Sequence, residues 1–235
     1  MTILSFTNQT KITISLIRLT MIKIPKAVIF DMDGTLVDSI PYHKKAWLSF
    51  LRNHEITLDD ESFQAQNHGT IEEMMCRFFG PTLTNTQLMT FSEKKERTFR
   101  EMYRPQIKEV DGLTDYLESI FLQKVRIGLA TMGDQNNIDF TLDSLGIRRF
   151  FNSTTGGHEV KKGKPDPEIY ELALTKVGVK SRDCLAFEDS IGGVKSAISA
   201  GIKVIGIATT HSREELLDFG CIKAVDNFES LLTGI

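Results

Sequence analysis

The sequence predicts an α/β fold: a doubly wound (Rossmann-like) parallel-sheet core with a small all-helical cap inserted after the first strand. Three observations predict this fold. Several short apolar runs have the near-continuous hydrophobicity of strands that helices cover on both faces. Helical patterns separate these runs along the chain, as in doubly wound sheets. Between the first run and Asp111, however, only helical patterns occur.

The expected strands are short, as buried parallel strands usually are. They lie at 24–30, 125–130, 184–187 and 203–208, with a weaker one at 222–225. Because each is apolar at consecutive positions, neither face is expected to contact water. The sheet therefore needs helices on both sides.

The helices between the strands have recognisable ends. Ser190 is expected to cap one helix, which ends at Gly201. Asp166 is expected to cap another, with Pro167 at its first position and Gly178 as its stop. Short polar side chains accept hydrogen bonds from the first turn of a helix, Pro fits that turn, and Gly readily takes the left-handed conformation after the last turn.

The cap is expected to contain at least three helices. Trp47 lies on the apolar face of the first. Two capping boxes, Thr70 with Glu73 and Thr84 with Gln87, open the second and the third, since a hydroxyl followed three residues later by Glu or Gln satisfies the free N–H groups of a helix start. The pattern indicates helix throughout this insertion.

These patterns divide the 235 residues into three parts. Residues 1–20 are expected to be an N-terminal extension, either from an upstream start or a disordered arm. Residues 21–37 and 111–235 form the α/β catalytic core, and residues 38–110 form the helical cap domain. The length fits one domain with a large insertion.

Composition excludes several classes of function. The formal net charge is -3 with balanced acids and bases, so no basic face for nucleic acid is expected. Three widely spaced cysteines without a CxxC pair argue against a disulfide framework and favour a reducing cytoplasm. No apolar stretch is long enough to span a membrane. We expect a cytoplasmic monomer.

Polar side chains follow three of the expected strands, where ligands bind in doubly wound sheets. Asp31 and Asp33 follow the first, Thr131 the second, and Glu188 and Asp189 the third. Clustered carboxylates repel one another unless a cation lies between them, and an oxygen-only set suits Mg²⁺. This edge is therefore expected to bind magnesium and a phosphate group.

Lys164 precedes the helix capped by Asp166, and with Thr131 it can neutralise and orient phosphoryl oxygens. Each fragment alone has a structural explanation: a DxDG turn, an acidic helix cap or a solvated lysine loop. Their joint placement at one sheet edge favours a functional site.

Four segments resemble the motifs of the haloacid dehalogenase superfamily, whose members are mostly phosphatases. They are AVIFDMDGTLVDS, LAT, KGKPDPEIY and FEDSIGGVKSAISAG. The resemblance extends from Lys23 to the C-terminus, and the helical insertion is similar to the family's small cap. With YHKKAW after the first motif, the chain is most similar to the β-phosphoglucomutase-like and sugar-phosphate phosphatase branch.

The resemblance implies a role for each motif residue. Asp31 is the nucleophile that forms an aspartyl phosphate, and Asp33 is the general acid and base. For Mg²⁺, the resemblance implies four ligands: Asp31, the Asp33 carbonyl, Asp189 and Glu188, the last directly or through water. For the phosphoryl group, it implies Thr131, the Met132 N–H and Lys164.

Two cap residues are further candidates for substrate contact. Lys95 lies on an apolar helix stripe, where it either extends to solvent or points into the cleft. His43 is either a packed core residue or, as the resemblance implies, part of the site. Where the mutases have a cap arginine this chain has Glu72, and Gly133 and Asp134 replace polar phosphate contacts.

These departures favour a phosphatase over a β-phosphoglucomutase, because a mutase must grip a bisphosphate in both orientations. The expected reaction is hydrolysis of a small phosphorylated metabolite such as a sugar phosphate, with the mutase as the alternative. A non-catalytic phosphometabolite-binding protein is a third hypothesis. It predicts that a motif residue is missing, and none is.

Overall fold

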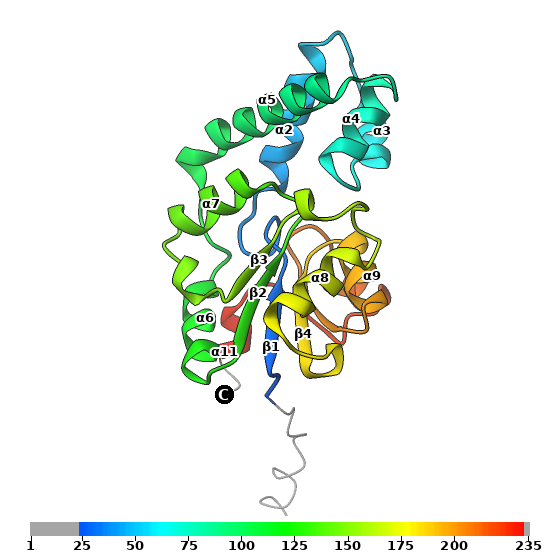
Figure 1. The fold of residues 1–235 in the computed structure, drawn as a ribbon. Coiled ribbons are helices and arrows are strands. Elements are labelled where there is room, and N and C mark those ends of the chain that lie inside the picture. Colours follow the sequence, from blue (N-terminus) through cyan, green and yellow to red (C-terminus); the bar gives the residue numbers. More distant parts are fainter. Residues whose placement is uncertain (1–23, 233–235) are drawn as a thin grey trace, which may run out of the picture.

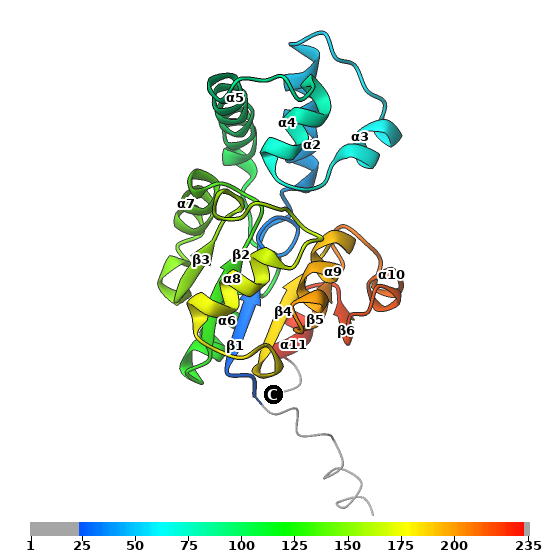
Figure 2. The ribbon, with the colours of Figure 1, turned by 45° about the vertical axis from the view of Figure 1, so that its right-hand side comes forward.

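The computed structural model describes residues 24–232, and the extension predicted at 1–20 lies outside them. Within this part of the chain, six strands form one parallel sheet of order β3-β2-β1-β4-β5-β6; Figure 1 labels the first four strands along the chain, and Figure 2 labels all six. The strands are β1 (Ala27–Phe30), β2 (Arg126–Ala130), β3 (Ser153–Thr155), β4 (Cys184–Glu188), β5 (Lys203–Ile207) and β6 (Lys223–Val225). The strand order reverses between β1 and β4, which is where doubly wound sheets bind ligands.

The doubly wound core confirms the predicted fold class. Helices α6 (Leu113–Leu122), α7 (Gln135–Ser144) and α11 (Glu229–Leu232) lie on one side of the sheet, and α8 (Glu168–Val177), α9 (Ile191–Ser199) and α10 (Arg213–Asp218) lie on the other (Figures 1 and 2). Alternate residues of β1 enter the two apolar clusters, Val28 and Phe30 on the α6 side and Ala27 and Ile29 on the α8 side. The alternation of side chains along a strand therefore buries both faces.

The sheet differs from the sequence prediction in two places. The first strand begins at Ala27 rather than at residue 24. Strand β3 was not predicted, because its three residues are Ser and Thr and give no apolar run. It forms by pairing with β2, from Gly128 opposite Ser153 to Ala130 opposite Thr155.

The predicted cap at Ser190 is confirmed, because its hydroxyl accepts a hydrogen bond from the Gly193 N–H at 3.1 Å. The Asp166 cap is displaced by one residue. Helix α8 begins at Glu168, and Pro167 occupies the cap position. The Asp166 carboxylate still accepts a hydrogen bond from the Glu168 N–H, at 3.1 Å, two residues further on, as capping side chains do.

The insertion after β1 is helical, as expected. Its helices are α2 (Ile40–Arg52), α3 (Asp60–Gln66), α4 (Ile71–Phe79) and α5 (Asn85–Tyr103), of which α3 was not predicted. Both capping boxes are present, Thr70 with Glu73 and Thr84 with Gln87. The cap has its own apolar cluster around Trp47 and lies beyond the carboxyl ends of the strands (Figure 2).

Two linkers connect the cap to the core, and they run side by side. Val37 forms an antiparallel bridge with Glu109, and the Val110 N–H donates to the Leu36 carbonyl at 2.9 Å. The exact domain limits at 37/38 and 110/111 stay a prediction.

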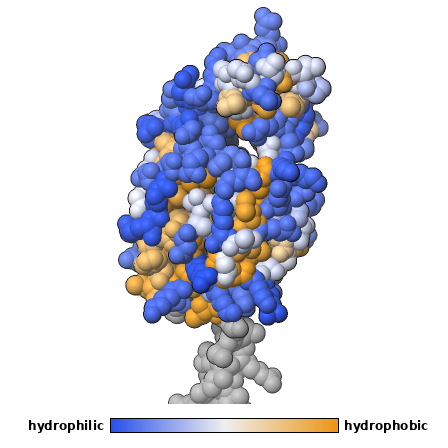
Figure 3. Space-filling view, in the orientation of Figure 1, coloured by the Kyte–Doolittle hydropathy of each residue, from blue (hydrophilic) through white to orange (hydrophobic). Residues whose placement is uncertain are grey.

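No helix among residues 24–232 is long and apolar enough to cross a membrane. Hydrophilic residues cover much of the face in Figure 3, and apolar residues show between them mainly over the core. Cys76, Cys184 and Cys221 are all free, as the sequence indicated. The cytoplasmic location and the monomeric state stay predictions.

Candidate active site

The loop after β1 brings the first motif against the last one. Asp31 follows β1 directly, and its N–H donates to the Phe187 carbonyl of β4 at 3.0 Å. At Gly34 the φ angle is +86°, and a Cβ atom there would lie 2.0 Å from Asp189 Oδ2. Glycine is therefore needed at position 34 for two reasons: its left-handed backbone conformation and the close approach of Asp189.

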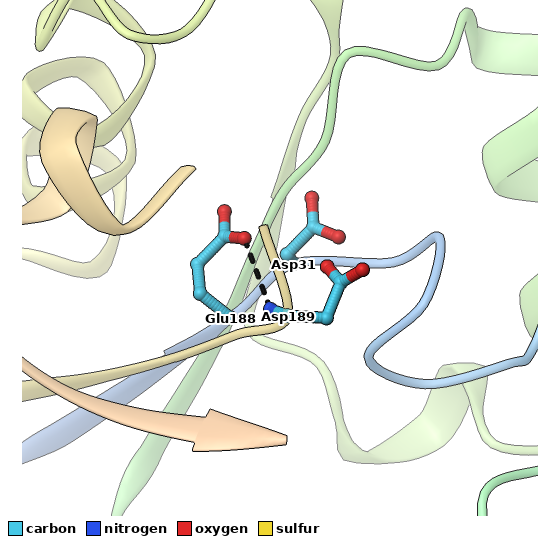
Figure 4. A group of neighbouring side chains, drawn as sticks. All are labelled: Asp31, Glu188 and Asp189. Carbon is cyan, nitrogen blue, oxygen red and sulfur yellow. Dashed lines mark hydrogen bonds between the residues drawn. The ribbon is translucent and has the colours of Figure 1, made fainter. Parts of the chain in front are cut away.

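Three buried carboxylates meet at this point. Asp31 follows β1, Glu188 ends β4 and Asp189 comes next, and one oxygen atom of each lies within 4.8 Å of the others (Figure 4). They are 6%, 0% and 1% exposed. The sequence placed these acids at one sheet edge, and the structure brings them together.

The cluster is electrostatically costly without a cation. Burial raises the pKa of Asp31 well above its usual range, Lys164 opposes this rise, and Glu188 adds to it. Burial, followed by the charge of Glu188, raises the pKa of Asp189 to about 7. Because every ligand atom is a carboxylate oxygen and one lysine offsets only part of the charge of three acids, the residues fit a divalent cation such as Mg²⁺.

Lys164 lies between two of these acids. Its Nζ atom is 2.6 Å from Asp31 Oδ1 and 2.6 Å from Glu188 Oε1, and it donates to the Ala130 carbonyl at 3.0 Å. Burial disfavours the ammonium, but the two carboxylates outweigh it and hold the pKa of Lys164 above its usual value. A buried ammonium therefore lies against both Asp31 and Glu188.

Several supporting residues were missed from the sequence. Tyr170 is fully buried on α8 and donates its hydroxyl to Glu188 Oε1 at 2.7 Å. Thr210 donates to Asp189 Oδ2, and Thr35 donates to Asp189 Oδ1 at 3.4 Å. Tyr170 lies within the third motif, but an aromatic residue on an apolar helix stripe looks like core. Thr210 follows the fourth predicted strand, at 203–208, and this position is the only signal for it.

Asp33 faces the cap rather than the three-carboxylate cluster. Its Oδ1 atom accepts from the Ser39 hydroxyl at 2.5 Å and lies 3.2 Å from His43 Nε2. Burial raises the pKa of Asp33, but the charge and hydrogen bond of His43 outweigh it and lower the pKa overall. The carboxyl groups of Asp31 and Asp33 thus lie in different surroundings. Without a cation, the shifts favour a proton on Asp31 and the ionised form of Asp33.

Thr131 is buried after β2, and its Oγ atom accepts from the Gly133 N–H at 3.0 Å. Its hydroxyl hydrogen is therefore the group left to donate. The adjacent Met132 packs partly against the α8-side apolar cluster. Asp134 caps α7 by accepting from the Asn137 N–H at 2.7 Å, so its departure from the mutase pattern has a structural explanation.

Lys95 does not extend to solvent. It is 1% exposed, and its Nζ atom lies 3.0 Å from His43 Nδ1 and 2.8 Å from Glu96 Oε1. His43 stacks on Phe99 with ring centroids 3.5 Å apart. The orientation toward solvent is therefore wrong, and the ammonium points toward His43 and Glu96; its orientation into a substrate cleft stays a prediction. Glu72, which the sequence resemblance matches to the mutase arginine, is exposed on α4.

A cavity of about 370 Å³ lies beside the linkers, between Tyr103, Glu109 and Asp226 among others. Asp31, Asp33 and Lys164 are not among the residues that line it. The site is therefore identified by its chemistry rather than by its volume.

The sequence profile of haloacid dehalogenase-like hydrolases matches residues 28–207. The chain belongs to this family. The match includes both linkers, the cap and every residue of the carboxylate cluster, and it confirms the family suggested by the four sequence motifs.

Relatives and solved structures agree with this family. A phosphorylated carbohydrates phosphatase of Thermotoga maritima is 31% identical, covering 88% of this chain and 96% of its own. A β-phosphoglucomutase of Bacillus subtilis is 29% identical, with coverage of 77% and 83%. The structure of a haloacid dehalogenase hydrolase (family IA, variant 3) from Entamoeba histolytica superposes with a TM-score of 0.77 at 30% identity, covering 87% of this chain and 94% of its own.

Proposed function

We propose that this protein is a Mg²⁺-dependent phosphatase that hydrolyses a small phosphorylated sugar through an aspartyl phosphate on Asp31. Its class, a phosphoric monoester hydrolase, follows from the family and its phosphatase relatives. The observation that carries the proposal is the convergence of three buried carboxylates with a buried lysine at one point. That arrangement gives both a nucleophile and the positive charge that a phosphoryl group needs.

In the first step, a carboxylate oxygen of Asp31 attacks phosphorus and the bond from phosphorus to the ester oxygen breaks. The leaving oxygen takes the electron pair of that bond and a proton from the Asp33 carboxyl group. Lys164 and the Thr131 hydroxyl hold the oxygens of the transferring group. Lys164 already lies 2.6 Å from Asp31 Oδ1, so it can exchange that contact for a phosphoryl oxygen.

In the second step, a water molecule attacks phosphorus and the Asp33 carboxylate accepts its proton. The acyl-phosphate bond breaks, Asp31 is regenerated and inorganic phosphate leaves. Asp189 and Glu188 would hold Mg²⁺ together with Asp31, and the ion would supply charge neutralisation for the carboxylates and the phosphate. Ser39 and His43 keep the Asp33 carboxyl group in place between the two steps.

The substrate preference is supported by the cap. A mutase needs a second cationic grip for a bisphosphate, and the position of that grip carries the exposed acid Glu72. A phosphatase needs only the one phosphate site at Asp31. The relative from T. maritima, named for phosphorylated carbohydrates, supports a sugar phosphate as substrate.

The test is phosphate release from a panel of phosphorylated sugars, nucleotides and pyrophosphate with Mg²⁺. We expect turnover of at least one sugar phosphate, complete loss in Asp31→Asn and loss on chelation that added Mg²⁺ reverses. Asp115→Asn, an exposed acid on α6, is the matched control and should retain wild-type activity. Turnover by Asp31→Asn would refute the mechanism, and net conversion of glucose 1-phosphate to glucose 6-phosphate with little free phosphate would establish the mutase instead.

A further inference from the structure

The cap buries a pair of opposite charges next to Asp33. Lys95 and Glu96 are neighbours on α5, and they are 1% and 7% exposed. Lys95 Nζ lies 2.8 Å from Glu96 Oε1 and 3.0 Å from His43 Nδ1, and His43 in turn contacts Asp33. The ammonium is therefore two contacts away from the residue that protonates the leaving group.

Glu96 is held in place from the core as well as from the cap. Its second oxygen, Oε2, accepts from the side-chain amide of Asn137 on α7 at 2.7 Å. Asn137 is fully buried and accepts from Arg100 Nη1 at 2.7 Å. With both oxygens engaged, Glu96 cannot turn away from Lys95 without breaking a buried hydrogen bond between cap and core.

This pairing removes the charge that a second substrate anion would need. Burial raises the pKa of Glu96, but the charges of Lys95 and His43 and the hydrogen bonds from Lys95 and Asn137 together lower it, which favours the charged form of Glu96. The neighbouring cation Arg100 also has an acid nearby, with Nη1 3.8 Å from Asp134 Oδ1. An anion brought up to Lys95 would meet the Glu96 carboxylate at the same time.

We propose that Glu96 determines specificity by neutralising Lys95, so that the site accepts phosphate monoesters with an uncharged leaving group and discriminates against bisphosphates. The inference rests on the proposed phosphatase function and deepens it.

The experiment measures competition against hydrolysis of p-nitrophenyl phosphate, whose leaving group carries no second phosphate. Glucose 6-phosphate and glucose 1,6-bisphosphate are the two competitors, each with Mg²⁺ in excess. In the wild type we expect the monophosphate to inhibit at least as strongly as the bisphosphate. Glu96→Gln keeps a hydrogen-bonding group for Asn137. In this variant the ratio of the two inhibition constants should change at least tenfold in the direction of tighter bisphosphate binding.

Three further variants separate charge from structure. Glu96→Asp keeps the charge and should keep the wild-type ratio. Glu96→Met removes the charge with an apolar side chain of similar length, and it should shift the ratio as Gln does, which also covers a failure of Glu96→Gln to fold. Glu101→Gln removes an exposed acid from the same helix and should change nothing.

The outcomes distinguish the two proposals. If the wild type does not hydrolyse p-nitrophenyl phosphate or any sugar phosphate, the phosphatase function fails. If it does, but the ratio of inhibition constants stays the same when the charge of Glu96 is removed, the role of Glu96 is wrong. Absence of inhibition by either competitor in both the wild type and Glu96→Gln would also overturn it.

Discussion

In the absence of a bound cation, the free energy of unfolding of this protein should fall as pH rises. Asp189 should be a main cause of this fall. Asp189 is 1% exposed, and burial together with Glu188 raises its pKa from 3.8 to about 7. Between these two values the folded, metal-free protein keeps a proton that the unfolded chain has released. The free energy of unfolding therefore decreases through this window, by about 1.4 kcal/mol per pH unit at most and by roughly 4 kcal/mol in total for this one group.

The sign follows from the direction of the shift. A carboxyl group whose pKa is higher in the folded state favours folding below its unfolded pKa, and this contribution is lost as pH rises through the folded value. Asp189→Asn removes the ionisable group while keeping an acceptor for Thr210. In chelator, the variant should thus show a flatter profile from about pH 4 to pH 7 and exceed the wild type in stability at pH 8.

The assay is urea denaturation in EDTA at several pH values from 4.5 to 8, with unfolding monitored by circular dichroism. Asp115→Asn, exposed on α6, serves as the control and should follow the wild-type profile. Added Mg²⁺ should stabilise the wild type more at pH 8 than at pH 5. At pH 8 the ion binds Asp189 without displacing a proton from it, whereas at pH 5 it must displace one. Parallel profiles for Asp189→Asn and the wild type in EDTA would refute the electrostatic account of the cluster.

Three substitutions test other parts of the site. Tyr170→Phe removes a hydrogen bond to a buried carboxylate and should destabilise the protein by about 1.5–3 kcal/mol in urea denaturation; an unchanged midpoint would contradict the contact with Glu188. Gly34→Ala places a Cβ atom 2.0 Å from Asp189 Oδ2, so calorimetric titration should show Mg²⁺ affinity reduced at least tenfold, and wild-type affinity would argue against this geometry. Gly163→Ala places a Cβ atom 2.4 Å from the backbone of Gly69 in the cap. It should lower kcat/KM with little change in Tm. An unchanged kcat/KM would show that the cap need not approach the core this closely.

The sequence predicted most of the core because the same side chains that define its strands are buried on both faces. Ala27, Val28, Ile29 and Phe30 are all fully buried, and each strand end then places its polar residues at a known edge. Strand β3 could not be found in this way. Its Ser and Thr residues form a strand through the hydrogen bonds that β2 offers, which is a tertiary effect rather than a local preference.

The cap contacts were harder to predict for a geometric reason. Neighbouring residues on a helix point about 100° apart, so a pattern that places Lys95 on the inner face places Glu96 to one side of it. Both are nevertheless buried, because Asn137 of the core reaches Glu96 from α7. A contact between parts of the chain that are 41 residues apart leaves no periodic signal in the sequence.

The paired linkers have a consequence for how the protein can be altered. Because Val37 bridges Glu109 and the Leu36 carbonyl bonds to the Val110 N–H, the chain leaves the core and returns to it at nearly the same place. A different insert, or a short turn, could join those two ends without stretching β1 or moving α6. The place where the chain leaves and re-enters the core is thus a natural point for exchanging one lid for another.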